Sequence, residues 1–173
     1  ACSTGEEAYS LAMYINEELR KQNKDLKVKI FATDIAKQHL EIGGNGVYSE
    51  STIADIDTEL VKKYFIKHSD GYQVVEKIRR MVIFSQHNII KNPPFSNMDM
   101  ILCRNLLIYF QQSIQHKTLN VLHYALKENG FLILGTSETV NSHREHFDEI
   151  SRKWKIYRNV SPRRRLNNDS LKP

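Results

Sequence analysis

The sequence is poor in cysteine, proline and glycine, and it has no long hydrophobic run. Of its 173 residues, 2 are Cys, 4 are Pro and 7 are Gly. Cys2 and Cys103 form no CxxC pair, which argues against a disulfide scaffold and favours a reducing compartment. No apolar run approaches the roughly 18 residues of a membrane span, and no signal peptide opens the chain. These absences predict a cytoplasmic protein without membrane insertion.

The sequence also offers little for metal binding. Of its 7 histidines, only His143 and His146 stand close together, and neither has a Cys or acidic partner at zinc-like spacing. We therefore expect surface histidines here and no metal site.

A strong excess of charge of one sign is missing as well. The net charge is +5, but Arg163, Arg164 and Arg165 belong to a polar C-terminal tail, and without them it is +2. Charge is therefore weak evidence for a nucleic-acid partner, and we expect none.

The chain does contain a repeated alternation of strand and helix patterns. Apolar stretches of strand length stand at 27–34, 81–85, 98–103 and 131–134, and helical spacing of apolar residues follows Glu6 and recurs at 35–40 and 113–126. Glycine-rich turns at 43–46 and 129–130 are expected to end the latter two helices. Segment 98–103 is expected to be buried on both faces, and 147–150 and 154–157 to be edge strands. This rhythm predicts an α/β domain with a mainly parallel sheet.

Residues 47–80 interrupt that rhythm. The pattern predicts a helix over 58–64, then two strands joined by the turn His68-Ser69-Asp70-Gly71, which carries the Asp-Gly pair typical of hairpins. Antiparallel pairing is foreign to a doubly wound core, so we expect a small inserted β-subdomain.

Polar groups stand where predicted strands and helices meet. A small polar stretch ending in Gly5 precedes the first helix; it is either a nucleotide-type turn or a simple helix start capped by Ser3 or Thr4. Asp34 ends a strand about thirty residues later. In Rossmann-like units an acid at this place accepts hydrogen bonds from ribose hydroxyls.

A second polar group follows segment 98–103. Arg104 and Asn105 come directly after it, and ligands of open α/β sheets bind beyond the carboxyl ends of the strands. The alternative is a core strand with a polar end, in which Arg104 is a structural cap and Tyr109 a half-buried core aromatic.

These residues resemble a known family. Segments 1–10 (ACSTGEEAYS), 31–35 (FATDI) and 103–110 (CRNLLIYF) are similar to CheR-type chemotaxis methyltransferases, which are S-adenosylmethionine-dependent protein-glutamate O-methyltransferases. Segments 91–96 (KNPPFS) and 135–139 (GTSET) look most like the CheR half of CheB/CheR fusion proteins.

The resemblance carries expectations about the architecture. It implies a Rossmann-like methyltransferase domain over 1–158 containing the 47–80 β-subdomain, and a polar tail over 159–173. The family's N-terminal helical domain and first strand are absent from the sequence, so we expect it to be a fragment. A sheet without that strand would expose apolar faces and unpaired edges.

The resemblance also implies roles for single residues. Cofactor contacts are expected at Glu7 (with Glu6 as its neighbouring candidate), Asp34, Asn88, Ile89, Arg104 and Asn105. Asp34 would hold the ribose or adenine side, Asn88 and Ile89 would edge the adenine, and Arg104 and Asn105 would lie beside the methionine portion. Tyr109, near the transferred methyl, and Arg104, which would orient a carboxylate, are the expected catalytic residues.

The implied reaction is methyl transfer from S-adenosylmethionine to glutamate carboxylates of the cytoplasmic domain of a chemoreceptor-like protein. In some members of the family the β-subdomain grips a receptor's C-terminal peptide. The alternatives are a catalytically silent S-adenosylmethionine-binding signalling module and a nucleic-acid adenine-N6 methyltransferase. The last is suggested by Asn92-Pro93-Pro94-Phe95, because such turns hold a flipped adenine. Here that turn precedes segment 98–103 instead of following it, so we expect only a loop.

Overall fold

The computed structural model describes residues 1–161, without the side chains of residues 141 and 142. The arginines at 163–165 therefore lie outside the described residues. The chain divides into two compact units, Ala1–His87 and Asn88–Pro173, which are described separately below. Among residues 1–161, no helix has the length and hydropathy needed to cross a bilayer.

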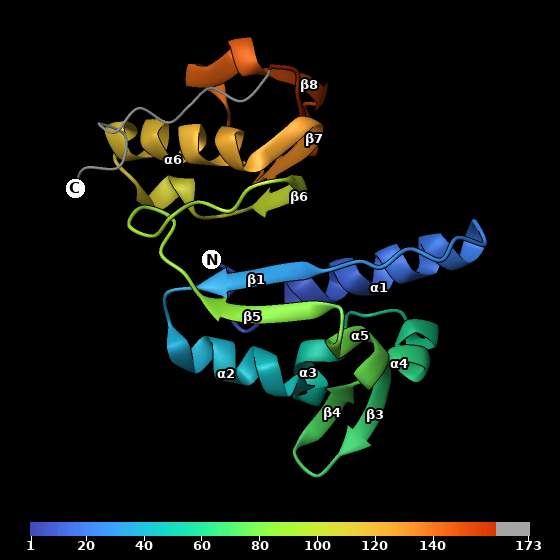
Figure 1. Ribbon diagram of the computed structural model, residues 1–173. Helices are drawn as coiled ribbons and strands as arrows, with labels where there is room; N and C mark the ends of the chain where they lie inside the picture. Colours follow the sequence, from blue (N-terminus) through green and yellow to red (C-terminus); the bar gives the residue numbers. More distant parts are fainter. Residues whose placement is uncertain (162–173) are drawn as a thin grey trace. The chain divides into compact units, whose positions relative to one another are not determined.

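The first unit is built on two parallel strands. β1 (Ile30–Asp34) pairs with β5 (Val82–Gln86) from Ile30–Val82 to Asp34–Gln86 (Figure 1). Helices α1 (Glu6–Lys21) and α2 (Lys37–Asn45) both pack against this pair. The parallel pairing requires a crossover, which the intervening chain supplies. The predicted α/β rhythm is thus confirmed in this unit.

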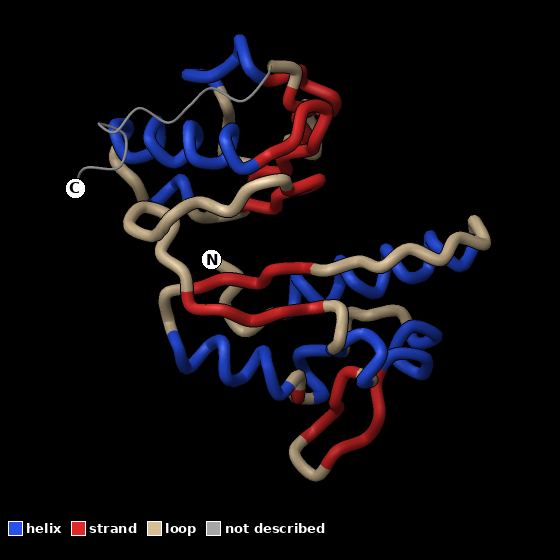
Figure 2. The backbone as a smooth tube through the Cα atoms, viewed as in Figure 1, coloured by secondary structure: helices blue, strands red, loops and turns tan. Residues whose placement is uncertain are grey.

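The inserted region forms a sheet of its own. It contains β2 (Val47–Tyr48), α3 (Glu50–Ile53), α4 (Thr58–Tyr64), β3 (Phe65–His68), β4 (Gly71–Val74) and α5 (Glu76–Arg79). The three strands are antiparallel in the order β2-β4-β3, and the β3–β4 hairpin stands out in Figure 2. Val74 and Ile78 are fully buried in the same core as Ala12 of α1. The predicted inserted β-subdomain is therefore confirmed, and it shares the core of the first unit.

The second unit combines parallel and antiparallel pairing. It contains β6 (Met98–Cys103), η1 (Leu107–Tyr109), α6 (Gln112–Ala125), β7 (Leu126–Leu134), η2 (Asn141–His146), β8 (Phe147–Ser151) and β9 (Ile156–Asn159). The strand order is β6-β7-β9-β8, with β6 and β7 parallel and the other pairs antiparallel. Leu119, Leu126 and Leu132 form the centre of its core.

One predicted helix stop is confirmed, and one is wrong. α2 continues beyond Leu40 through Gly43 and Gly44, but it ends within the predicted 43–46 turn, at Gly46, whose φ of 62° closes the helix. α6 ends at Ala125 and β7 begins at once, so Asn129 and Gly130 lie inside the strand. There Asn129 has a φ of 62°, within an irregularity of the β6–β7 register. Gly43 allows close packing, and Gly130 lies at an irregularity of the strand pairing. In the sequence, glycines with these roles cannot be distinguished from a glycine that ends a helix.

Several predictions of burial are also wrong. Within residues 1–161, β6 is an edge strand beside β7, and Met100 on it is 41% exposed, so the predicted burial of this strand on both faces is wrong. β9 lies between β7 and β8 and is not an edge strand. The segment of His143 and His146 is not a surface one, because both side chains are buried beside α6. Phe31 and Ile83 are partly exposed on the β1–β5 pair, as expected for a sheet with open edges.

Candidate functional site

The glycine loop, residues 1–5, leads into α1 through a left-handed residue. Gly5 is the N-cap of α1 with a φ of 92°, and no side chain caps the helix. The interpretation as a simple helix start capped by Ser3 or Thr4 is therefore wrong. The Gly5 N–H donates instead to the Cys2 carbonyl at 3.0 Å, which closes a tight turn. Such a turn needs the backbone freedom of glycine.

The same loop is bonded to the end of β1. The Ser3 N–H donates to Asp34 Oδ2 at 2.9 Å, and the Ala36 N–H donates to Asp34 Oδ1 at 3.0 Å. The Cys2 N–H donates to the Thr33 carbonyl at 2.9 Å. Asp34 is buried, which by itself would raise the pKa of its carboxyl, but the N–H donors outweigh burial and hold that pKa below its ordinary value. The loop and the acid thus form one structure.

Phe84 of β5 explains two of the glycines. A Cβ atom on Gly5 would lie 2.6 Å from Phe84 Cζ, and one on Gly43 would lie 2.4 Å from Phe84 Cε1. The ring therefore packs directly against the backbone of both residues. Tyr9 lies against the same ring, with centroids 5.6 Å apart, and its hydroxyl donates to the Gly43 carbonyl at 2.7 Å. Burial raises the pKa of Tyr9 to about 12, against the opposing charge of Arg79.

The inserted sheet also holds the glycine loop. The Tyr48 hydroxyl, from β2, donates to the Thr4 carbonyl at 2.8 Å. Burial raises the pKa of Tyr48 above its ordinary value, so the hydroxyl keeps its proton and remains a donor. The loop is thereby tied to β1 on one side and to β2 on the other. Glu7, in the first turn of α1, is partly exposed.

In the second unit, Arg104 and Asn105 follow β6 as predicted, and both are exposed. Asn105 has a φ of 55° and begins the site loop, defined here as residues 105–109, which runs through η1. Tyr109 ends η1 and is 78% exposed, so its interpretation as a half-buried core aromatic is wrong. An exposed ring is available to a ligand; its catalytic role stays a prediction.

Glu138 holds the site loop, and sequence reasoning assigned it no role. Its buried carboxylate accepts five backbone N–H groups. Oε1 accepts from Leu106 at 2.9 Å, Leu107 at 2.7 Å and Ile108 at 3.4 Å. Oε2 accepts from Asn105 at 3.0 Å and Gly135 at 2.7 Å. The sequence places Glu138 in the turn after the strand 131–134, within the segment GTSET that contributes to the family resemblance, but neither signal indicates what the side chain contacts.

Asn88 and Ile89, which are expected to lie beside the adenine ring, begin the connection to β6. Asn88 Oδ1 accepts the N–H groups of Ile90 at 2.9 Å and Lys91 at 3.1 Å, so this oxygen is used in a turn. The backbone N–H of Asn88 donates to Asn92 Oδ1 at 2.6 Å. Asn92 and the two prolines after it form a loop, as predicted. The roles of Asn88 and Ile89 toward a ligand stay predictions.

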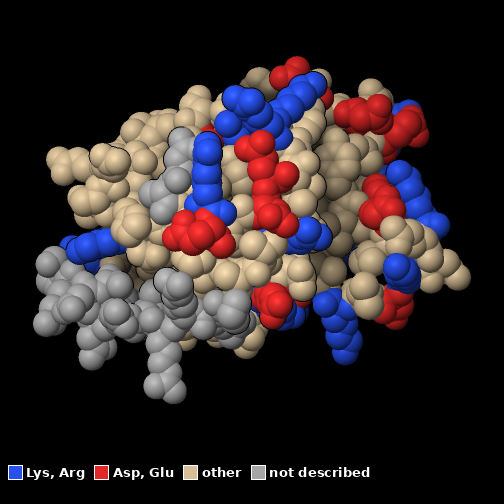
Figure 3. Space-filling model, turned by 90° about the horizontal axis from the view of Figure 1, so that it is seen from above, with Lys and Arg blue, Asp and Glu red and all other residues tan. Residues whose placement is uncertain are grey.

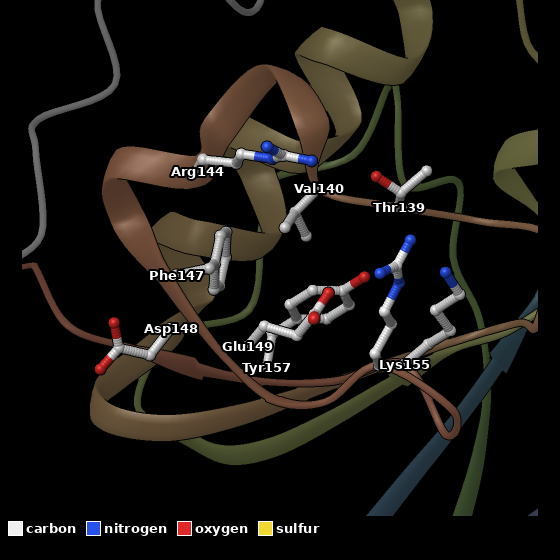
Figure 4. A pocket seen from close by; sticks show the side chains of 9 residues that line it. Thr139, Val140, Arg144, Phe147, Asp148, Glu149, Lys155 and Tyr157 are labelled. Carbon is white, nitrogen blue, oxygen red and sulfur yellow. The ribbon is translucent and has the colours of Figure 1, made fainter.

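A separate cavity of about 570 Å³ lies in the second unit (Figure 4). Arg144 and Lys155 extend toward it, and Arg152 lines it as well, but Asp148 and Glu149 line the same space. Acidic and basic side chains are likewise mixed on the face seen in Figure 3. Basic and acidic side chains thus both line the cavity, and none of the predicted site residues lines it. Within the described residues, no group of three or more His, Cys, Asp or Glu is arranged to hold a metal ion.

A glycine loop bonded to an acid at the carboxyl end of a parallel strand defines the Rossmann-like class of cofactor-binding domains. The comparison with known families is more specific. Residues 1–156 match the family described as "CheR methyltransferase, SAM binding domain", and the chain belongs to that family. S-adenosylmethionine is accordingly its cofactor.

Curated relatives agree with this family. The chain is 36% identical over 146 residues to a "Chemotaxis protein methyltransferase" of Borreliella burgdorferi, covering 83% of this chain and 52% of that protein. It is 35% identical over 161 residues to an uncharacterized 104.1 kDa protein of Rhodobacter capsulatus, covering 93% of this chain and 17% of that protein. The second match is consistent with a CheR segment inside a larger protein. The chain thus spans about half, or less, of these relatives.

Solved structures are more distant. The N-methyltransferase NodS from Bradyrhizobium japonicum aligns with a TM-score of 0.45 and 12% identity, over 77% of this chain and 67% of that one.

The described residues fit this cofactor. The Ser3 and Ala36 N–H groups donate to different oxygens of Asp34 at about 3 Å, and a carboxylate with about four acceptor sites retains capacity for a ribose hydroxyl. The glycine loop in front of α1 supplies the tight backbone turn that such sites use. Whether Arg104 and Asn105 complete the same site stays a prediction.

Proposed function

We propose that this chain carries the cofactor-binding and catalytic residues of an enzyme that methylates glutamate side chains of a chemoreceptor-like signalling protein. The products are a glutamate methyl ester and S-adenosylhomocysteine. The observation that carries the proposal is the bond between the glycine loop and Asp34, in a chain of the CheR family. The site of action would be the cytoplasm, where the signalling domain of such a receptor lies.

The reaction is an in-line displacement. When bound, S-adenosylmethionine supplies a methyl group activated by a positively charged sulfur. A glutamate oxygen forms a bond to the methyl carbon while the carbon–sulfur bond breaks and its electron pair stays on sulfur. Glutamate has an ordinary pKa of ≈ 4.3, so the nucleophile is ionised near neutral pH and needs no general base. This agrees with Arg104 and the site loop after it, which together offer an arginine and a tyrosine but no histidine.

The protein would contribute positioning. Asp34 accepts hydrogen bonds from the ribose hydroxyls, and the Arg104 guanidinium can orient a carboxylate with two parallel N–H donors. The Tyr109 hydroxyl is exposed and able to donate to the reacting groups. Glu7, Asn88, Ile89 and Asn105 would complete the contacts to the cofactor.

We assign the β3–β4 hairpin to receptor binding. β3 is an edge strand of the inserted sheet, and Ile66 on it is 53% exposed. An extended peptide can add to such an edge through main-chain hydrogen bonds, with exposed apolar side chains giving specificity.

The test is methyl transfer from S-adenosylmethionine labelled in its methyl group to the cytoplasmic fragment of a chemoreceptor, using the full-length protein. Label released as methanol by mild base identifies a carboxyl methyl ester. Base-stable label on an adenine-containing oligonucleotide would contradict the proposal in favour of the nucleic-acid enzyme. Cofactor binding without transfer to any receptor fragment would favour the silent signalling module.

A further inference from the structure

Five backbone N–H groups of other residues converge on the Glu138 carboxylate. The Glu138 side chain is only 3% exposed, and its donors come from two places, the site loop and the residue after β7. Donor and acceptor are 30 to 33 residues apart in the chain for the four site-loop contacts. Hydrogen bonds from N–H groups to a carboxylate are stronger than those to a neutral acceptor, so this cluster contributes to the position of the site loop.

The site loop is also held by the burial of Leu107 and by Gln115, whose Nε2 donates to the Leu107 carbonyl at 3.0 Å, but these contacts do not reach the N–H groups that Glu138 accepts. η1 is three residues long, and its internal bonds run from Tyr109 N–H to the Leu106 carbonyl at 3.2 Å and from Phe110 N–H to the Leu107 carbonyl at 3.0 Å. Asn105 is left-handed, a conformation that few residues other than glycine and asparagine adopt. The left-handed conformation of Asn105 allows the backbone N–H groups of residues 105–108 to point at one carboxylate.

The far side of the cluster is equally tight. A Cβ atom on Gly135 would lie 2.7 Å from Glu138 Oε2 and 3.0 Å from the Asn105 nitrogen. The carboxylate therefore has no room to move toward β7. The position of the carboxylate determines where the backbone of Asn105 lies. Through η1 it also determines the position of the Tyr109 backbone.

We propose that Glu138 is a positioning residue for methyl transfer: it holds Asn105 and Tyr109 in the geometry that cofactor binding and reaction require. The inference rests on the proposed function, because it takes Asn105 as a cofactor contact and Tyr109 as a catalytic residue. In this role Glu138 need not touch the cofactor or the substrate. Its action is exerted through the backbone of the site loop.

The test is Glu138→Gln in the full-length protein. Glutamine has the same shape, but its NH₂ group must face either the N–H of Asn105 and Gly135 or the three N–H groups bound by Oε1. We expect at least tenfold weaker binding of S-adenosylhomocysteine by calorimetry. We also expect a fall in kcat for methyl transfer, and faster hydrogen exchange of the Leu106 and Leu107 amides.

Asn159→Ala is the matched control. Asn159 is fully buried, and its Nδ2 donates to the Lys127 carbonyl at 3.1 Å, near the opposite end of β7. Its loss destabilises the same unit without touching the site loop. We expect it to lower the melting temperature by as much as Glu138→Gln but to leave cofactor affinity within twofold of wild type.

A double variant separates positioning from general stability. If Glu138 acts through Tyr109, adding Tyr109→Phe to Glu138→Gln lowers kcat much less than Tyr109→Phe does in the wild type. If Glu138→Gln does not fold, Gly135→Ala replaces it, because the added methyl pushes the carboxylate from Asn105 while leaving all five N–H groups an acceptor.

The outcomes are distinct. Wild-type protein that fails to bind S-adenosylhomocysteine would overturn the proposed function and this inference with it. A wild type that binds, together with Glu138→Gln or Gly135→Ala at unchanged affinity and kcat, would overturn the inference alone. Equal losses in Asn159→Ala would also overturn it, since they would reveal an effect of stability only.

Discussion

The backbone N–H of Ser3 donates to Asp34 Oδ2 at 2.9 Å and so joins the glycine loop to the end of β1. The two residues are 31 positions apart. Because the loop leads directly into α1, this bond sets both the start of the helix and the orientation of the carboxylate. A cofactor that binds the acid therefore meets a loop that is already in place, which reduces the entropy lost on binding.

The packing of Phe84 against Gly43 predicts a sharp difference between two adjacent glycines. Gly43→Ala places a methyl group 2.4 Å from the Phe84 ring, whereas a Cβ on Gly44 meets nothing within 4 Å. We expect Gly43→Ala to lower the free energy of unfolding by roughly 1–3 kcal/mol. Gly44→Ala, in the same helix, is expected to raise it by about 0.5–1 kcal/mol.

Urea unfolding followed by circular dichroism measures both variants. The altered Phe84 ring also borders Gly5, so Gly43→Ala should weaken S-adenosylhomocysteine binding while Gly44→Ala does not. Equal stability of the two variants would mean that Phe84 does not determine the position of the glycine loop.

The buried histidine His143 predicts a loss of stability in mild acid. Its ring lies 4.4 Å from that of His116 and 6.1 Å from that of His146, and Nε2 is 2.8 Å from Asn120 Oδ1. Burial, and then the neighbouring His116, lower the pKa of His143 from 6.5 to about 4. The unfolded chain therefore binds a proton between these two pH values while the folded protein does not, so stability falls as pH decreases through that window.

Between pH 7 and about pH 5 the expected loss from this group is roughly 2 kcal/mol. The fluorescence of Trp154, the single tryptophan of the sequence, reports unfolding of the second unit in urea. His143→Gln should flatten the dependence of stability on pH. A variant with the same slope as wild type would show that another group is responsible.

The exposed isoleucine on β3 predicts a variant defective only in receptor binding. Ile66→Lys adds a charge to the edge of the inserted sheet and leaves the glycine loop untouched. We expect at least tenfold weaker binding to a receptor fragment that ends in its natural C-terminal peptide, at unchanged S-adenosylhomocysteine affinity. Ile150→Lys is the matched control, since Ile150 is 50% exposed on the edge strand β8. Equal effects of both changes would contradict the assignment of the β3–β4 hairpin to receptor binding.

The hydroxyl of Tyr109 predicts an effect on catalysis but not on stability. Its side chain is exposed, so Tyr109→Phe should change the free energy of unfolding by less than about 0.5 kcal/mol. Loss of one hydrogen bond to the reacting groups should reduce kcat roughly tenfold at unchanged cofactor affinity. Tyr14→Phe, at a tyrosine 66% exposed on α1, serves as control. An unchanged kcat would leave the Tyr109 hydroxyl without a role.

Local signals predicted some elements well. β6 begins at Met98 and ends at Cys103, and α4 spans Thr58–Tyr64, because polar residues and turns mark both of their ends. The place of Asp34 at the end of β1 was predicted for the same reason, because an acid closes an apolar run there.

Contacts between distant segments were not predictable. Glu138 accepts backbone N–H groups about thirty residues away. A sequence pattern does not indicate which backbone N–H groups need a side-chain acceptor. Gly43 resembles a helix stop, yet its role is to admit the Phe84 ring. Likewise β9 was expected at an edge, since its few apolar residues do not reveal that β8 returns to cover it.

The most direct test of the account is the affinity of Asp34→Ala for S-adenosylhomocysteine, measured by calorimetry on the full-length protein. We expect a loss of roughly 1.5–3 kcal/mol in binding free energy, because charge-assisted hydrogen bonds to the ribose disappear. Asp57→Ala is the control: Asp57 also accepts backbone N–H groups, from Glu59 and Leu60, but at the start of α4. Wild-type affinity in Asp34→Ala, or an equal loss in Asp57→Ala, would contradict the assignment of the glycine loop and Asp34 as the cofactor site.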